Sequence, residues 1–202
     1  MKRFSMSILS LLIFHIGMAQ FNHDPAFKKF GFRAGANFCH FNFAKGSPPP
    51  ATPIETSWEP GINLGFLMVV PITGQLFCQT EYLYSQMSGK IKGTKTAYHL
   101  DYFSLPVFLK YQLLEKFSLM AGPQFDLLIG AKKIDEGTST NITHDTEERS
   151  ISVTAGVEYQ FTNSLGVAAR YMHGLNHIGI GQRSDVQEFK LESFQLSAFV
   201  KF

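Results

Sequence analysis

The sequence is short of cysteine and has no excess of charge of either sign. Its two cysteines, Cys39 and Cys78, are too few for a disulfide framework or a cysteine zinc site. Eighteen Lys and Arg residues nearly balance sixteen Asp and Glu residues, and no basic run occurs. The composition therefore excludes a disulfide-stapled domain and makes nucleic acid a poor candidate partner.

Long apolar runs are also missing beyond residue 19, so no segment there suits a spanning helix of about 20 residues. At the start, Lys2 and Arg3 precede an apolar stretch, Ile8–Ile16, and the small residues Gly17 and Ala19 follow it at the positions that a signal peptidase reads. This pattern predicts a secretory signal peptide over residues 1–19, cleaved after Ala19. The alternative is a membrane-anchoring helix, which the short apolar core disfavours.

Motifs of catalysis and cofactor binding are absent as well. No Gly-x-Ser-x-Gly elbow, phosphate loop or dinucleotide fingerprint occurs. His173 and His177 are four residues apart, which on a strand separates their rings by about 13 Å, too far for one metal ion. For a barrel enzyme acting on lipid, Ser150, His144 and Asp145 are the candidates, and they belong to or adjoin a polar loop that needs no catalytic explanation. We predict no catalytic residue, metal or cofactor, and keep the barrel enzyme as a minor alternative.

The sequence is rich in residues that alternate between apolar and polar with period two, as in strands with two different faces. Connections after the first, third, fifth and seventh alternating segments are long, and the others are short. Each segment reaches the 9–11 residues that a tilted strand needs to cross a bilayer. We predict an all-β, eight-stranded antiparallel up-and-down transmembrane β-barrel over residues 30–202, after a short periplasmic segment at 20–29. The segments are Phe30–Phe41, Pro60–Val70, Leu76–Gln86, Tyr98–Tyr111, Phe117–Gly130, Ser150–Phe161, Leu165–Asn176 and Leu191–Phe202.

One face of each segment is apolar and the other carries glycine, serine and charged residues. A wide apolar face indicates a wall toward lipid, with small and charged side chains inside. Buried charges must pair, so we predict a lumenal charge network that plugs and stiffens the barrel. A soluble periplasmic lipid-binding barrel is the alternative, and it needs the reverse arrangement of faces. Cys39 and Cys78 fall on opposite faces and are expected to be free thiols. The network residues are Arg33, Glu81, Lys110, Asp126, Glu158, Arg170 and Lys201.

A series of short motifs occurs in order along the chain: Phe30–Asn37, Thr80–Gln86, Tyr102–Val107, Lys110–Tyr111, Ala121–Pro123, Gly156–Tyr159, Arg170–Tyr171, Gly174–Asn176 and Phe202. Together these motifs resemble the PorT-like outer-membrane β-barrel proteins, which are abundant in Bacteroidetes. The resemblance covers nearly all of the mature chain and implies an integral outer-membrane barrel without an assigned reaction. The family takes its name from a member that assists protein secretion by the type IX route.

Phe202 is similar to the aromatic C-terminal residue by which the barrel-assembly machinery recognises its clients. We therefore expect three kinds of partner: outer-membrane lipid, the barrel-assembly machinery during biogenesis, and proteins of an envelope or secretion assembly. The expected role is structural or accessory, in the cell outer membrane.

Overall fold

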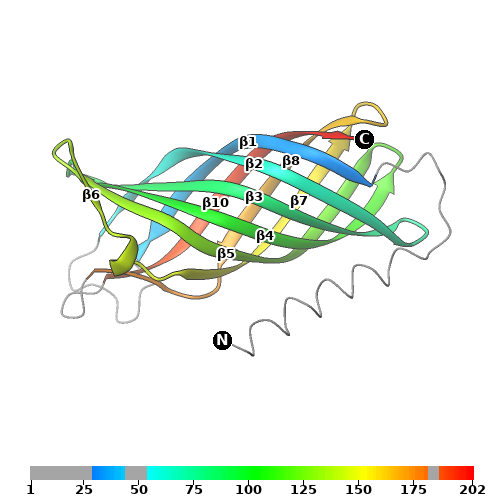
Figure 1. Ribbon diagram of the computed structural model, residues 1–202. Helices are drawn as coiled ribbons and strands as arrows, with labels where there is room; N and C mark the ends of the chain where they lie inside the picture. Colours follow the sequence, from blue (N-terminus) through cyan, green and yellow to red (C-terminus); the bar gives the residue numbers. More distant parts are fainter. Residues whose placement is uncertain (1–28, 44–53, 182–186) are drawn as a thin grey trace.

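The computed structural model describes residues 29–43, 54–181 and 187–202, which form one closed β-barrel (Figure 1). The predicted signal peptide at 1–19, and all but residue 29 of the predicted periplasmic segment, lie outside the described residues. The eight long strands of the barrel are β1 (Phe30–Asn42), β2 (Thr56–Thr73), β3 (Leu76–Ile91), β4 (Ala97–Leu114), β5 (Phe117–Asp135), β7 (Arg149–Gln160), β8 (Leu165–Gly174) and β10 (Gln187–Lys201).

Each long strand pairs antiparallel with its neighbours in chain order, and β1 pairs with β10 to close the barrel. The seam runs from Gly31 opposite Lys201 to Asn42 opposite Lys190. The predicted eight-stranded up-and-down barrel is therefore confirmed. The C-terminus and the short turns lie at one end, which we call the turn end, and the longer connections lie at the loop end (Figure 1).

Several strands extend further toward the loop end than the sequence predicted. β3 continues to Ile91, and β5 continues to Asp135. The connection after β5 then forms the short strand β6 (Thr138–Asn141) and the 3-10 helix η3 (Thr143–Asp145), and β9 (Ile178–Ile180) lies in the last connection. Backbone ladders satisfy N–H and C=O groups in water as well as in lipid, so strand pairing need not stop at the membrane boundary.

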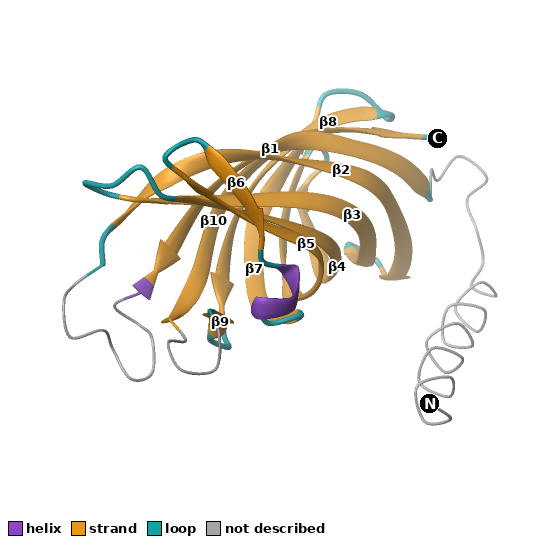
Figure 2. Cartoon of the chain, turned by 60° about the vertical axis from the view of Figure 1, so that its left-hand side comes forward, coloured by secondary structure: helices purple, strands orange, loops and turns teal. Residues whose placement is uncertain are grey.

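The extended parts of β3, β4 and β5 form, with β6, a hairpin extension over residues 88–99 and 131–141. Figure 2 shows it rising beyond the barrel at the loop end. The β5–β6 turn consists of Glu136 and Gly137, both with positive φ, as a type I′ hairpin turn requires. The Thr96 hydroxyl donates to the Asp135 carboxylate at 3.1 Å, which joins the two hairpin tips.

Side-chain burial alternates along the strands and places the large apolar residues outside. On β1, Phe30, Phe32 and Phe38 are exposed, whereas Arg33 and Asn37 are buried inside the barrel. This is the arrangement of a barrel wall that faces lipid. Cys39 is buried, Cys78 is partly buried, and both are free thiols as expected.

The loop half of the lumen holds an apolar plug that the sequence did not predict. Ile178 and Ile180 of β9 fold into it from the last connection, and Phe41 stacks on Phe189 with ring centroids 4.4 Å apart. Gly89 makes room for this contact, because a Cβ there would lie 2.6 Å from the Phe41 ring. The buried plug residues are Cys39, Phe41, Phe43, Met87, Tyr98, Leu100, Tyr102, Ala131, Met172, Ile178, Ile180, Phe189 and Leu191.

Among the described residues, no helix has the length and apolar character needed to cross a membrane.

Candidate functional site in the lumen

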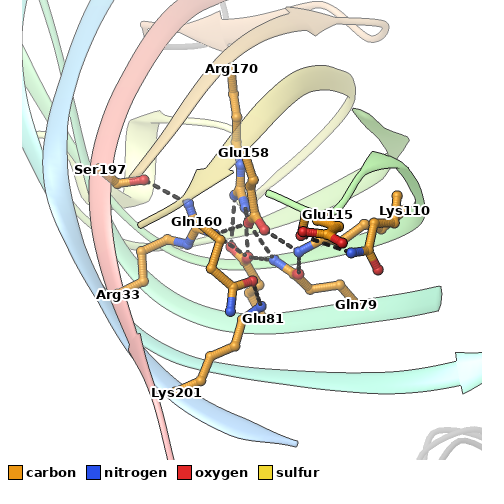
Figure 3. A network of polar contacts seen from close by, with 11 residues as sticks. Arg33, Gln79, Glu81, Lys110, Glu115, Glu158, Gln160, Arg170, Ser197 and Lys201 are labelled. Atoms are coloured by element: carbon orange, nitrogen blue, oxygen red, sulfur yellow. Dashed lines mark hydrogen bonds and ion pairs between the residues drawn. The ribbon is translucent and has the colours of Figure 1, made fainter. Parts of the chain in front are cut away.

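Two glutamates from opposite sides of the barrel form the centre of a charged cluster below the plug (Figure 3). Glu81 of β3 accepts two hydrogen bonds of 2.7 Å from the Arg170 guanidinium of β8. Glu158 of β7 accepts one of 2.5 Å from Arg33 of β1 and another from the Lys110 ammonium of β4. The side chains of Arg33, Glu81, Glu158 and Arg170 are at most 2% exposed. Such bidentate and charge-assisted bonds are the stronger class of hydrogen bond.

Neutral polar and aromatic side chains surround these ions. The Gln79 amide donates to Glu81 at 2.6 Å and to Glu158 at 3.1 Å, which ties the two carboxylates together. The Arg170 guanidinium lies 4.5 Å from the Phe108 ring centroid, and the Arg33 guanidinium lies 5.3 Å from that of Phe199. These cation–π contacts stabilise the cations on sides that no carboxylate reaches.

A glycine on β7 provides the space for Arg170. Gly156 lies directly opposite Arg170 in the β7–β8 register. A Cβ at this position would lie 2.7 Å from Arg170 Cγ and 2.4 Å from the Ala169 carbonyl oxygen. Because the second atom belongs to the backbone, a larger residue would have to displace strand β8. The glycine-rich inner face therefore matches the size of the arginine that fills it.

Five of the seven residues predicted for the network share carboxylate contacts: Arg33, Glu81, Lys110, Glu158 and Arg170. Lys201 lies at the edge of the same cluster, where it donates to Gln160 at 3.4 Å and lies 4.9 Å from the Phe199 centroid. No carboxylate within ion-pair distance of Lys201 is found in the described part of the chain.

Asp126 does not meet a cation among the described residues, which differs from our prediction. It is fully buried on β5 and accepts a hydrogen bond of 2.8 Å from Gln124. Its Oδ2 atom has no hydrogen-bond partner in the described part of the chain. The reason is its position along the strand: Glu158 pairs with Ser118, and Asp126 lies eight residues further along β5. This separation is roughly 27 Å along the tilted strand and less along the barrel axis.

The residues considered for catalysis do not form an accessible site. Ser150 is buried on the lumenal face of β7, and the His144 side chain is exposed on η3. Within residues 29–43, 54–181 and 187–202, no group of three or more His, Cys, Asp or Glu side chains is placed to hold a metal ion. The lumen therefore offers fixed ion pairs rather than an open reaction centre.

A second polar group lies on the outer wall near the loop ends of three adjacent strands. Glu192 of β10 stands between His40 of β1 and His173 of β8 in the sheet register. The His40 Nδ1 atom is 3.8 Å from Glu192 Oε2, and the His173 Nδ1 atom is 3.5 Å from Glu192 Oε1. We call these three residues the rim cluster. Sequence reasoning did not find this cluster, because only the strand register brings the three residues together.

Comparison with known proteins identifies the class of barrel. A family model described as an outer membrane protein beta-barrel domain matches residues 18–179.

The chain belongs to this outer-membrane β-barrel family.

Two solved outer-membrane barrels share its fold. Neisserial surface protein A is 16% identical, with a TM-score of 0.55, and the match covers 86% of this chain and 97% of that protein. The attachment invasion locus protein Ail of Yersinia pestis is 13% identical, with a TM-score of 0.52, and the match covers 87% of this chain and 99% of Ail. No curated protein sequence matches the chain.

The outer-membrane barrel therefore places its exposed apolar wall in outer-membrane lipid. In this class the short turns face the periplasm and the longer connections face the outside, so the hairpin extension is extracellular. A soluble periplasmic barrel would need a polar outer wall, and the exposure of Phe66, Leu109 and Leu196 on the outside contradicts that alternative.

Proposed function

We propose that this outer-membrane barrel is a non-conducting structural or accessory protein that contacts other envelope or secretion proteins at the cell surface. The proposal is supported above all by the way the lumen is filled. The ion cluster occupies the periplasmic half and the apolar plug occupies the extracellular half. A barrel of eight strands has room for such side chains but not for an aqueous channel as well. A filled lumen fits a protein that contacts partners at the cell surface better than it fits a transporter.

The hairpin extension is the part best suited to contact a partner. Strand β6 pairs with β5 alone among the described strands, and all four of its residues are exposed. Ile142 donates its N–H to the Ala131 carbonyl on β5. Because N–H directions alternate along a strand, the N–H groups of Ser139 and Asn141 point away from β5. At this edge the Ser139 and Asn141 N–H groups can donate main-chain hydrogen bonds to an extended segment of a partner protein.

Substitution of Ser139 by proline tests the proposed contact. Ser139→Pro removes an outward N–H and leaves the β5–β6 bonds in place, whereas Ser139→Ala keeps the N–H and serves as the matched control. Both proteins would be purified from gently solubilised outer membranes after chemical cross-linking and separated by size on native gels. We expect Ser139→Ala to retain the cross-linked higher-mass species and Ser139→Pro to lose it. Equal patterns for the two variants would contradict the role of this edge.

The finer predictions belong to the same proposal. They comprise membership of the PorT-like subgroup, the signal peptide over residues 1–19, and recognition of Phe202 by the barrel-assembly machinery. The placement of Phe202 is compatible with recognition, since its side chain is 67% exposed on the outer wall. Its N–H donates to the Phe30 carbonyl at 2.9 Å, so the residue lies at the β1–β10 seam.

A further inference from the structure

The ion cluster in the periplasmic half of the lumen contains more cations than carboxylates. Four cationic side chains meet two carboxylates there, which leaves two positive charges uncompensated within the described part of the chain. All six residues are at most 8% exposed. The cations are Arg33, Lys110, Arg170 and Lys201, and the carboxylates are Glu81 and Glu158 (Figure 3).

Other acidic residues of the described chain do not supply the missing negative charge. Asp126 shares the lumenal face but lies eight residues along β5 from Ser118, which pairs with Glu158. Glu115, also drawn in Figure 3, is an exposed residue of the turn between β4 and β5, and no ion pair joins it to Lys110 or Lys201. Buried charge without a counter-charge is costly. The cluster therefore favours an anion from outside the chain.

Two lysines of the cluster lie near the same aromatic ring. The Lys201 Nζ atom is 4.9 Å from the Phe199 ring centroid, and the Lys110 Nζ atom is 6.0 Å from it. Lys110 has a carboxylate partner in Glu158, whereas Lys201 donates only to the Gln160 side-chain oxygen, at 3.4 Å. An ammonium group has three N–H donors. Lys201 therefore keeps donors for a further acceptor.

The same two lysines are the most exposed members of the cluster. Lys201 is 8% exposed and Lys110 is 5% exposed, against 1% for Arg33. Lys201 is the last residue of β10, and Lys110 lies four residues before the end of β4, so both are near the turn end. The apolar plug fills the opposite half of the lumen. A small ion can therefore reach the lysines only from the periplasm.

We propose that the periplasmic mouth of the barrel binds one doubly charged oxyanion, such as hydrogen phosphate, between the ammonium groups of Lys201 and Lys110. Its two charges match the two that the carboxylates leave uncompensated. Its oxygens accept charge-assisted hydrogen bonds from both lysines. Chloride brings one charge and a single acceptor atom, so it binds more weakly. The site is independent of the surface contacts proposed above.

Equilibrium dialysis of the purified barrel against radiolabelled phosphate measures the binding directly. The protein is kept in detergent micelles at mildly alkaline pH, where most phosphate carries two charges. We expect one phosphate per barrel, displaced by sulfate but not by the same concentration of chloride. Low anion concentrations exclude the general stabilisation that concentrated phosphate and sulfate give to proteins.

Substitutions at Lys201 locate the bound anion. Lys201→Gln removes one of the two ammonium groups and is expected to weaken phosphate binding about tenfold, the contribution of one charge-assisted hydrogen bond. Lys201→Arg keeps the charge and should keep most of the affinity. Lys116→Gln is the matched control, because it removes an exposed lysine from the turn between β4 and β5 at the same end, and it should leave the affinity unchanged.

Resistance to urea gives a second measurement with the opposite sign for a purely structural lysine. Without phosphate, Lys201→Gln should be at least as resistant as the unchanged protein, because it removes an uncompensated buried charge. Added phosphate should raise the resistance of the unchanged protein and of Lys116→Gln, but not that of Lys201→Gln. The shift in gel mobility on heating checks that each variant is folded.

Absence of phosphate binding by the unchanged protein would overturn the proposal, as would equal binding by Lys201→Gln. Displacement of phosphate by the same concentration of chloride would overturn it too, because it would show an unselective attraction of anions to the mouth.

Discussion

Glu158 lies within ion-pair distance of three cations, Arg33, Lys110 and Arg170. Substituting glutamine would leave these buried cations with Glu81 as their only close carboxylate among the described residues. Breaking a buried ion pair by removing one partner is strongly destabilising. We expect Glu158→Gln to lower the free energy of unfolding by about 3–5 kcal/mol. Urea unfolding in lipid vesicles, followed by Trp58 fluorescence, measures it.

Two other carboxylates serve as comparisons in the same measurement. Glu55 pairs with Lys92 at 3.2 Å, but the two side chains are 72% and 57% exposed. Glu55→Gln should therefore change the stability by less than about 1 kcal/mol. Asp126 is buried without a cation, so we expect Asp126→Asn to leave the stability unchanged or to raise it by roughly 1 kcal/mol. A loss at Asp126 as large as at Glu158 would mean that Asp126 has a cationic partner.

The sequence predicts which residues of each strand face inward and which face outward. It does not predict which two inward residues contact each other. All seven charges predicted for the lumen are buried in the structure. Which of them meet depends on the tilt and stagger of the strands, which shift each strand along its neighbour. Glu81 and Arg170 are distant in sequence and meet across the lumen, whereas Asp126 shares their face but lies too high. The face of the strand on which a residue lies does not tell how far along the barrel axis that residue is.

Strand β9 is held both by the apolar plug and by pairing with the start of β10. Ile178 is fully buried in the plug, and the backbone of Gly179 and Gly181 bonds to the segment before β7. A carboxylate in this position would be unpaired and buried. We expect Ile178→Asp to release β9 from the plug and to make the connection between β8 and β10 sensitive to protease added outside the cell.

The matched control is Leu175→Asp, in the same connection but with a side chain that is 51% exposed. It should leave the protease resistance unchanged. Both variants should keep the shift in gel mobility on heating, because the eight long strands do not depend on β9. Equal resistance of Ile178→Asp and the unchanged protein would show that β9 is held by its backbone bonds alone.

The long strands were predictable as elements, whereas β6, β9 and the plug were not. β6 has only four residues, all polar, and β9 has three, too few to establish a period. The plug residues Phe41, Leu100 and Leu191 share parity with the lumenal charges, but their apolar character resembles that of the wall. Polarity distinguishes the two faces clearly in the periplasmic half and less clearly in the loop half, where the apolar plug residues share the lumenal face with Asp126 and Ser150.

The molecule as a whole should not conduct ions. Met172, Leu100 and Leu191 are fully buried in the plug, and Arg33 and Glu81 are buried in the ion cluster below it. We expect the reconstituted protein to give no stepwise currents in planar bilayers, in high salt and over the usual range of voltage. Ile178→Asp should stay closed as well, because the ion cluster is intact. Steady current steps from the unchanged protein would contradict the closed lumen.

The closure of the barrel and the spatial order of its strands could both be predicted from the sequence. Alternate long and short connections join strands that are neighbours in the barrel, so chain order gives spatial order. The hairpin extension could not be anticipated, because loop length alone does not distinguish a paired strand from an irregular segment.

The alternation of faces also determines how such a sequence is free to diverge over evolution. An outward position needs only to be apolar, so Leu, Phe, Val or Tyr can replace one another there singly. An inward position is coupled to several others through volume and charge, as Gly156 is to Arg170 and Arg170 to Glu81. Among distant descendants of one ancestor, we therefore expect wall residues to drift one at a time and lumenal residues to change in groups.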